Sequence, residues 1–160
     1  MDEVDQIVGA WQRERPDLDV TPLQVLSRVT RLARQLDLTR RHAFTEHDLA
    51  SWEFDVLAAL RRAGAPYTLS AGQLGSQTLV SSGTITNRVD RLQARDLVQR
   101  LPDPNDRRGV LVQLTPAGIA AVDGALTALL DHERELLHGL SASQQRDLAR
   151  LLRTLGSTLV

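Results

Sequence analysis

One stretch of the sequence, residues 80–115, reads as a helix that runs into a two-stranded hairpin. The small residues Ser81–Thr84 open an amphipathic run, and small polar residues of this kind favour helix starts. Segments 97–101 and 110–114 then alternate apolar and polar residues, as half-buried strands do. Between them, residues 102–109 are rich in Pro, Asp, Asn and Gly, which favour turns. This stretch therefore predicts a helix followed by a β-wing.

Helical patterns fill most of the chain on both sides of this stretch. Apolar spacing, capping residues and breaking prolines predict helices over 2–14, 21–43, 49–63, 71–78, 116–138 and 141–156, with another beginning at Ser81 or Ser82. We expect Asp48 to cap the third of these helices and Gly64 to end it. The expected fold class is mainly α with a small β-wing.

Two of the expected helices are short and nearly consecutive. The segment 71–78 and the helix from Ser81 or Ser82 are joined by a few residues, which is the helix-turn-helix pattern. Together with the hairpin they predict a winged helix-turn-helix over residues 48–115. We expect a single domain, 1–160, in which residues 1–47 and 116–160 are dimerisation helices.

The dimer expectation rests on leucine content. The C-terminal helices carry more leucine than one thin helical extension could bury within itself, and a second copy of the chain is the simplest cover. These leucines are Leu126, Leu129, Leu130, Leu136, Leu137, Leu148, Leu151, Leu152 and Leu155.

Charge separates the middle of the chain from its ends. Residues 57–115 hold eight Arg against four acidic residues, a balance of +4, whereas the rest holds 11 Arg against 16 acidic residues, a balance of −5. Only the middle should attract phosphate. Every one of the 19 basic residues is Arg, which can fork onto phosphates and guanines. The middle region is therefore the expected nucleic-acid surface.

Other composition features narrow the class. The chain has no Cys and no apolar run near the roughly 18 residues that span a membrane, and its acidic start lacks a signal-peptide pattern. We expect a cytoplasmic protein, associated with the nucleoid when bound to DNA. No nucleophile elbow, phosphate loop or zinc-protease helix is present, so we expect no enzyme. The four His lack metal-like spacing, and we expect neither a metal nor a cofactor.

The helix after the turn and the hairpin tip supply the candidate DNA contacts. Hydroxyl residues at a helix start let the backbone approach phosphates, while Asn and Arg can read adenine and guanine edges. Arg at a hairpin tip suits the minor groove or the phosphates. The candidates are Ser81, Ser82, Thr84, Thr86, Asn87, Arg91, Arg107 and Arg108. There are alternatives to DNA contact for these residues. The serines could serve only as helix caps, the hairpin tip could simply be solvated, and Asp106 could pair with one of the two tip arginines.

The same residues resemble a known family. The segment from the short helix through the tip DPNDRRG to the motif Leu114–Gly118 looks like the winged helix-turn-helix of the MarR family of bacterial transcription regulators. That resemblance implies an obligate homodimer held by the N- and C-terminal helices. Trp11 on an extra first helix, the segment 52–56 and SSGTITNRVDRL resemble the urate-responsive branch of the family more narrowly.

The narrower resemblance implies a ligand site. Its matching positions are Trp11, Asp55, Arg88 and Arg100. Arg can grip a planar anion with two hydrogen bonds, and Trp offers a face for stacking. The implied effector is a small anion of the urate, xanthine, trans-aconitate or aromatic carboxylate class. The alternatives to ligand binding are core packing for Trp11 and a plain ion pair for Asp55. Trp52 and Tyr67 look like packing residues.

We therefore expect a homodimeric regulator, usually a repressor, that a small anion releases from a near-palindromic double-stranded operator. The alternative function is an architectural or accessory DNA-binding protein that responds to no small molecule. Trp11, Asp55 and Arg88 discriminate between the two functions, because only the first needs them.

Overall fold

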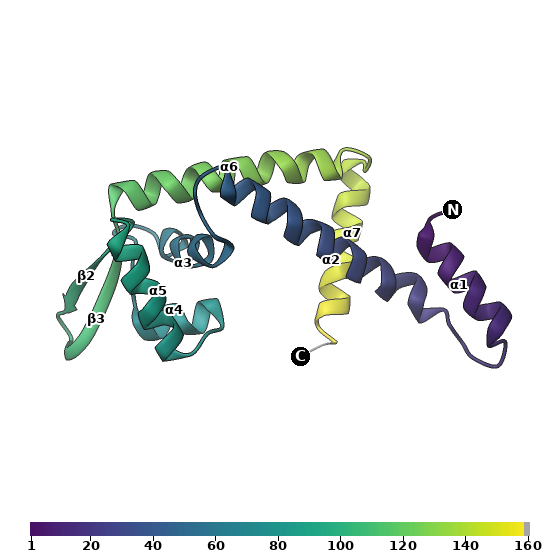
Figure 1. The fold of residues 1–160 in the computed structure, drawn as a ribbon, viewed down its shortest axis with the longest axis horizontal. Coiled ribbons are helices and arrows are strands. Elements are labelled where there is room, and N and C mark those ends of the chain that lie inside the picture. Colours follow the sequence, from purple (N-terminus) through teal and green to yellow (C-terminus); the bar gives the residue numbers. More distant parts are fainter. Residues whose placement is uncertain (159–160) are drawn as a thin grey trace. The chain divides into compact units, whose positions relative to one another are not determined.

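The computed structural model describes residues 1–158, apart from the side chains of Arg107 and Arg108. Within this part the elements follow in the order α1 (Glu3–Glu14), α2 (Pro22–Thr45), α3 (Ser51–Arg62), β1 (Thr68–Ser70), α4 (Ala71–Thr78), α5 (Ser82–Ala94), β2 (Val98–Asp103), β3 (Asp106–Leu114), α6 (Pro116–Leu137) and α7 (Ala142–Gly156) (Figure 1). The expected mainly helical fold with a small β-wing is confirmed. The chain divides into two compact units, Met1–His42 and Ala43–Val160.

Ion pairs join α1 to α2 in the first unit, in which Val4 and Val8 of α1 are buried. Arg28 on α2 donates from Nε to Asp2 over 2.9 Å and from Nη2 to Asp5 over 2.7 Å, and Arg31 pairs with Glu3. Hydrogen bonds from the Asp5 backbone N–H and from Arg28 lower the pKa of the Asp2 carboxyl. Asp2 is also the N-cap of α1, so the same side chain starts the helix and ties it to α2.

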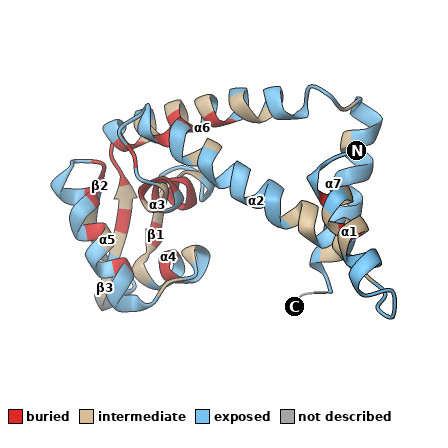
Figure 2. Cartoon of the chain, turned by 45° about the vertical axis from the view of Figure 1, so that its right-hand side comes forward, coloured by how far each residue is buried: buried red, intermediate tan, exposed pale blue. Residues whose placement is uncertain are grey.

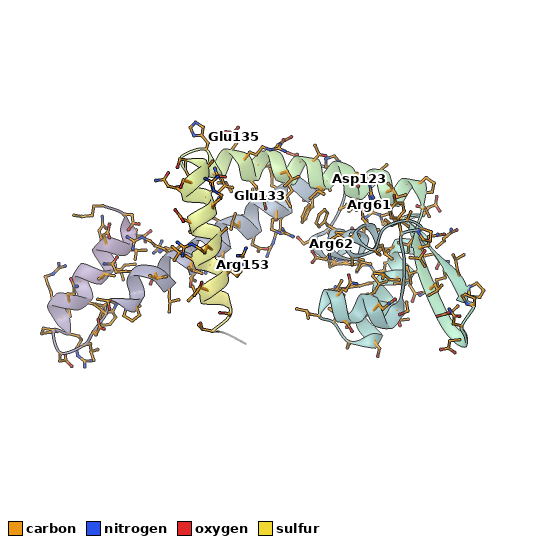
Figure 3. All side chains as sticks on the ribbon, turned by 180° about the vertical axis from the view of Figure 1, so that it is seen from behind. Arg61, Arg62, Asp123, Glu133, Glu135 and Arg153 are labelled. Carbon is orange, nitrogen blue, oxygen red and sulfur yellow. The ribbon has the colours of Figure 1, made fainter. Side chains whose placement is uncertain are left out.

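The core of the second unit is built around α3. Seven of its twelve residues are buried, and their red colour in Figure 2 marks the centre of this unit. Phe54 stacks on Phe44 at the end of α2, with ring centroids 4.1 Å apart. On the outer side of α3, Arg61 donates from Nε to Asp123 of α6 over 2.9 Å, and Figure 3 labels both side chains. The salt bridge fixes the N-terminal half of α6 against α3.

The sheet has three strands in the order β1-β3-β2, all antiparallel. The expected hairpin is present, with Val98 opposite Leu114 and Leu101 opposite Leu111. Strand β1 was not expected, because three residues are too few to show alternation. It adds Leu69 opposite Val112 and anchors the hairpin to the start of α4.

Several capping predictions are confirmed and one is wrong. Ser81 caps α5, and Gly64 follows α3 with a φ of 78°. Asp48 does not cap α3, which begins at Ser51 after Ala50. The Glu53 carboxylate accepts from the Ala50 N–H over 2.8 Å instead.

Asp48 serves a different contact, a clamp between α3 and α5. Arg95, the C-cap of α5, donates to the Asp48 carboxylate and to Glu53, each over 2.8 Å. Glu53 is buried, with 5% of its surface exposed, so its charge needs this partner. The clamp fixes the first turn of α3 against the end of α5.

The C-terminal helices leave leucines exposed. Helix α7 has no buried residue among those described, and it is pale blue and tan in Figure 2. Leucines exposed by 38–56% on α6 and α7 are Leu126, Leu130, Leu136, Leu137, Leu148, Leu151 and Leu152. Across the described residues, no helix combines the length and apolar character needed to cross a membrane.

Candidate nucleic-acid interface and anion site

The turn between α4 and α5 is set by a close backbone approach. The Val80 N–H donates to the Gly75 carbonyl over 3.1 Å, and a Cβ on Gly75 would lie 3.2 Å from the Val80 carbonyl oxygen. Leu79 turns the chain with a φ of 55° and is 91% exposed. The turn therefore packs α4 tightly against the start of α5, as a helix-turn-helix requires.

Helix α5 separates a buried face from an exposed one. Ile85, Val89 and Leu92 pack into the core of the second unit. The expected DNA contacts in this region are all exposed, namely Ser81, Ser82, Thr84, Thr86, Asn87 and Arg91. The structure thus gathers these six residues on the start and outer side of one helix.

Some of the exposed hydroxyls already hold the helix start. The Ser81 hydroxyl accepts from the Thr84 N–H over 3.4 Å and lies 3.0 Å from the Thr84 hydroxyl. The Thr86 hydroxyl donates to the Ser82 carbonyl over 2.9 Å. Capping and phosphate contact are compatible, because a phosphate oxygen accepts hydrogen bonds and one hydroxyl of the Ser81–Thr84 pair keeps a proton to donate. The first N–H groups of a helix also have no partner within the helix.

The wing is the hairpin of β2 and β3. Its turn is tightened by the Asn105 N–H, which donates to the Asp103 carboxylate over 2.8 Å. A Cβ on Gly109 would lie 2.9 Å from the Asp103 Cβ, so the tip needs glycine there. The predicted contacts Arg107 and Arg108 belong to β3, but their side chains lie outside the described residues.

A hollow of about 460 Å³ opens beside the outer face of α5. It is lined by Trp52, Gly83, Thr84, Asn87, Arg88 and Arg91. The guanidinium carbons of Arg91 and Arg88 lie 4.9 and 5.5 Å from the centroid of the Trp52 ring. Trp52 packs against the core as expected, but it remains half-buried and also contacts two arginines.

Arg100 lies on the other side of α5 from Arg88. Its Nη1 is 2.6 Å from the Asp90 carboxylate and donates to the Gln93 side chain over 3.1 Å. Asp90 and Gln93 fall nearly opposite Arg88 on a helical turn of 3.6 residues. The structure therefore does not bring the two predicted ligand arginines, Arg88 and Arg100, together within one chain.

The other two predicted ligand residues occupy different elements. Asp55 is an exposed residue of α3 and lies one turn after Trp52, on the side of α3 that carries Trp52. Trp11 belongs to α1 in the Met1–His42 unit and is 49% exposed. Asp55, by helical spacing, and Arg88, by contact, are thus both neighbours of Trp52 in the second unit.

The spacing of three arginines on α5 was a sequence signal for the Trp52 contact that our sequence analysis did not use. Arg88, Arg91 and Arg95 are spaced three and four residues apart, so they form one stripe along α5. Arg95 binds the first turn of α3 and the other two lie over Trp52. In the described residues, no three His, Cys, Asp or Glu gather as metal ligands would.

The short α4–α5 pair, the exposed helix face and the hairpin define a winged helix-turn-helix DNA-binding protein. Residues 47–109 match the MarR family. The regulator PecS of Dickeya dadantii is 37% identical over 150 residues, which are 94% of this chain and 90% of PecS. The chain belongs to the MarR family, and its relatives are transcription regulators, not enzymes.

Two solved structures extend the comparison. A mutant E. coli MarR complexed with operator DNA aligns with a TM-score of 0.66 at 29% identity, over 86% of this chain and 99% of that one. Bordetella bronchiseptica BpsR, whose DNA binding is regulated by 6-hydroxynicotinic acid, aligns with a TM-score of 0.62 at 29% identity, over 81% of this chain and 98% of BpsR.

Proposed function

We propose that this protein is a homodimeric repressor that a small planar anion releases from a near-palindromic operator. The observation that carries the proposal is the exposed face of α5, where candidate base-reading residues and Arg88 share one hollow. The DNA complex of E. coli MarR and the regulation of BpsR by an aromatic carboxylic acid support both halves of the proposal by analogy.

Dimerisation accounts for the exposed leucines. A monomer that exposes leucines along both α6 and α7 would present many apolar side chains to water. A second copy related by a two-fold axis covers the same surface on both chains at once. A two-fold dimer would present two α5 helices and two wings, which matches a near-palindromic duplex.

The anion site is proposed at Arg88, with Asp55 and Trp11 as further contacts. Arg88 is a permanent cation that can bind a carboxylate or a urate anion with two parallel hydrogen bonds. Asp55 can accept an N–H of the ligand, and Trp11 offers an exposed ring. Arg100 pairs with Asp90 on the other side of α5, so it would not contact an anion bound to Arg88 of the same chain.

Release follows from the position of Arg88 on the helix that meets DNA. An anion that binds Arg88 most tightly when α5 is away from its DNA-compatible position shifts the population towards that state. The free energy of this equilibrium changes at most by the difference between the ligand's binding free energies for the two states. This is how one helix would serve both reading and sensing.

Base reading predicts a specific effect for Arg91→Ala. Removing one bidentate base contact should weaken binding by about 1–3 kcal/mol and relax the sequence preference at that base pair. A duplex selected by the wild-type protein from a randomised library, with its single-base-pair variants, supplies the measurement. Arg62→Ala, at the exposed end of α3, is the control, and unchanged preference at every position would exclude Arg91 from base contact.

The wing prediction concerns salt dependence. Arg107→Ala together with Arg108→Ala should weaken operator binding and lower the slope of log K against log salt by about one for each phosphate that the wing no longer neutralises. Titrations between low and moderate salt measure the slope, with Arg62→Ala at the end of α3 as the control. An unchanged slope would remove the wing from the interface.

The alternative is a DNA-binding architectural protein without an effector. The exposed face of α5 serves that function equally well, whereas a ligand-responsive Arg88 does not belong to it. DNA affinity that is insensitive to urate, xanthine, trans-aconitate and 6-hydroxynicotinic acid would favour this alternative.

A further inference from the structure

Trp52 occupies an unusual position for a large aromatic residue. It is the second residue of α3 and half-buried, with part of its surface packed against the core. Its ring also lies within 5.5 Å of two guanidinium groups from α5. Both distances fall inside the roughly 6 Å over which a cation is attracted to an aromatic face.

The backbone that carries Trp52 is fixed relative to α5. Arg95 joins the end of α5 to Glu53, the residue after Trp52, over 2.8 Å, and to the Asp48 carbonyl over 2.7 Å. Arg91 lies one helical turn before Arg95 on the same stripe. The clamp therefore holds the Trp52 ring at a defined place beneath Arg91.

An aromatic ring beneath Arg91 would restrict the orientation of its guanidinium group. A long exposed arginine samples many rotamers, and a base contact through both guanidinium N–H edges requires one plane and one direction. A ring beneath the guanidinium restricts the plane before DNA arrives, which reduces the ordering that binding must otherwise supply. The other polar side chains that line the hollow are Thr84, Asn87 and Arg88.

We propose that Trp52 is a positioning residue that orients Arg91 for contact with the operator. Trp52 acts through the arginines and need not touch DNA itself. The inference rests on the proposed function, because it assumes that Arg91 reads a base.

The test is a double-mutant cycle with the selected duplex and its single-base-pair variants as probes. Trp52→Leu keeps apolar bulk but removes the aromatic face, and Trp52→Phe keeps a ring. Trp52→Leu should weaken binding to the selected duplex about fivefold and compress the affinity ratios at the base pair that Arg91 reads. Trp52→Phe should retain most of the affinity for the selected duplex and most of the affinity ratios. Both variants should bind an unrelated duplex as the wild-type protein does.

In the Arg91→Ala background, Trp52→Leu should cause little further loss of discrimination. The positioning role would be overturned if Trp52→Leu reduced discrimination by the same factor with Arg91 present and absent. It would also be overturned if Trp52→Leu alone discriminated between duplexes as well as the wild-type protein does. Discrimination that is intact in Arg91→Ala itself would overturn the assignment of Arg91 and the inference with it. A urea midpoint for each variant separates a folding defect from a positioning defect, because misfolded protein loses binding to both duplexes together.

Discussion

Gly118→Ala is expected to destabilise the fold by about 3 kcal/mol, since inserting bulk at a packed site costs 1–3 kcal/mol and more when backbone must move. A Cβ on Gly118 would lie 2.0 Å from the carbonyl oxygen of Leu97 and 3.1 Å from a methyl carbon of Leu114. The Leu97 carbonyl already accepts from the Thr115 N–H over 3.2 Å. The first turn of α6 therefore cannot accommodate a side chain without separating from the start of β2.

Gly139→Ala is the matched control for this substitution. No described atom lies within 4 Å of a Cβ at Gly139, and its φ is not in the left-handed region. Urea unfolding should show a large drop for Gly118→Ala and little change for Gly139→Ala. Equal free energies of unfolding in the two variants would contradict the close approach at Gly118.

Arg88→Ala is expected to remove most of the response to the effector. Losing a charged hydrogen-bonding group from a ligand site costs about 1.5–3 kcal/mol, so half-release should need roughly 10- to 150-fold more ligand. The probe is whichever of urate, xanthine and trans-aconitate best displaces the wild-type protein from its selected duplex. Affinity is measured with and without that anion.

The ratio of the two affinities isolates sensing from DNA binding, because Arg88 lies on the DNA-binding helix and its loss can weaken both. Arg62→Ala, an exposed arginine at the end of α3, controls for the loss of a positive charge. A normal ratio in Arg88→Ala would show that the anion binds elsewhere.

Local signals accounted for much of the fold. The start of α5 was recognisable at Ser81, because short polar side chains accept from N–H groups two or three residues ahead. The hairpin was recognisable because its strands alternate and its turn is rich in Pro, Asp and Asn. These features depend on neighbours in sequence, so the chain reveals them directly.

Contacts between distant residues were not predictable in the same way. Asp48 looks like a helix cap from the sequence. In the structure Arg95 binds the buried carboxylate of Glu53, and the same guanidinium also binds Asp48. Strand β1 exists only because β3 is there to pair with it. Trp52 looks like core on α3, and its second contact appears only when the arginine stripe of α5 lies beside it.

In the candidate site, too, some features were predictable from local sequence and others depend on contacts between distant residues. The exposed residues of α5 follow from helical periodicity, because Ile85, Val89 and Leu92 had to face the core. Which arginines share a hollow depends on the direction of each side chain. Arg100 belongs to a neighbouring strand, yet it pairs with Asp90 on the side of α5 away from Arg88. The resemblance could not supply that geometry.

The most direct test of a dimer that presents two copies of α5 and the wing is footprinting combined with stoichiometry on the selected duplex. Two chains should bind one duplex and protect two half-sites whose centres lie about one helical turn, ~10 bp, apart. Protection of a single half-site by one chain would contradict such a dimer.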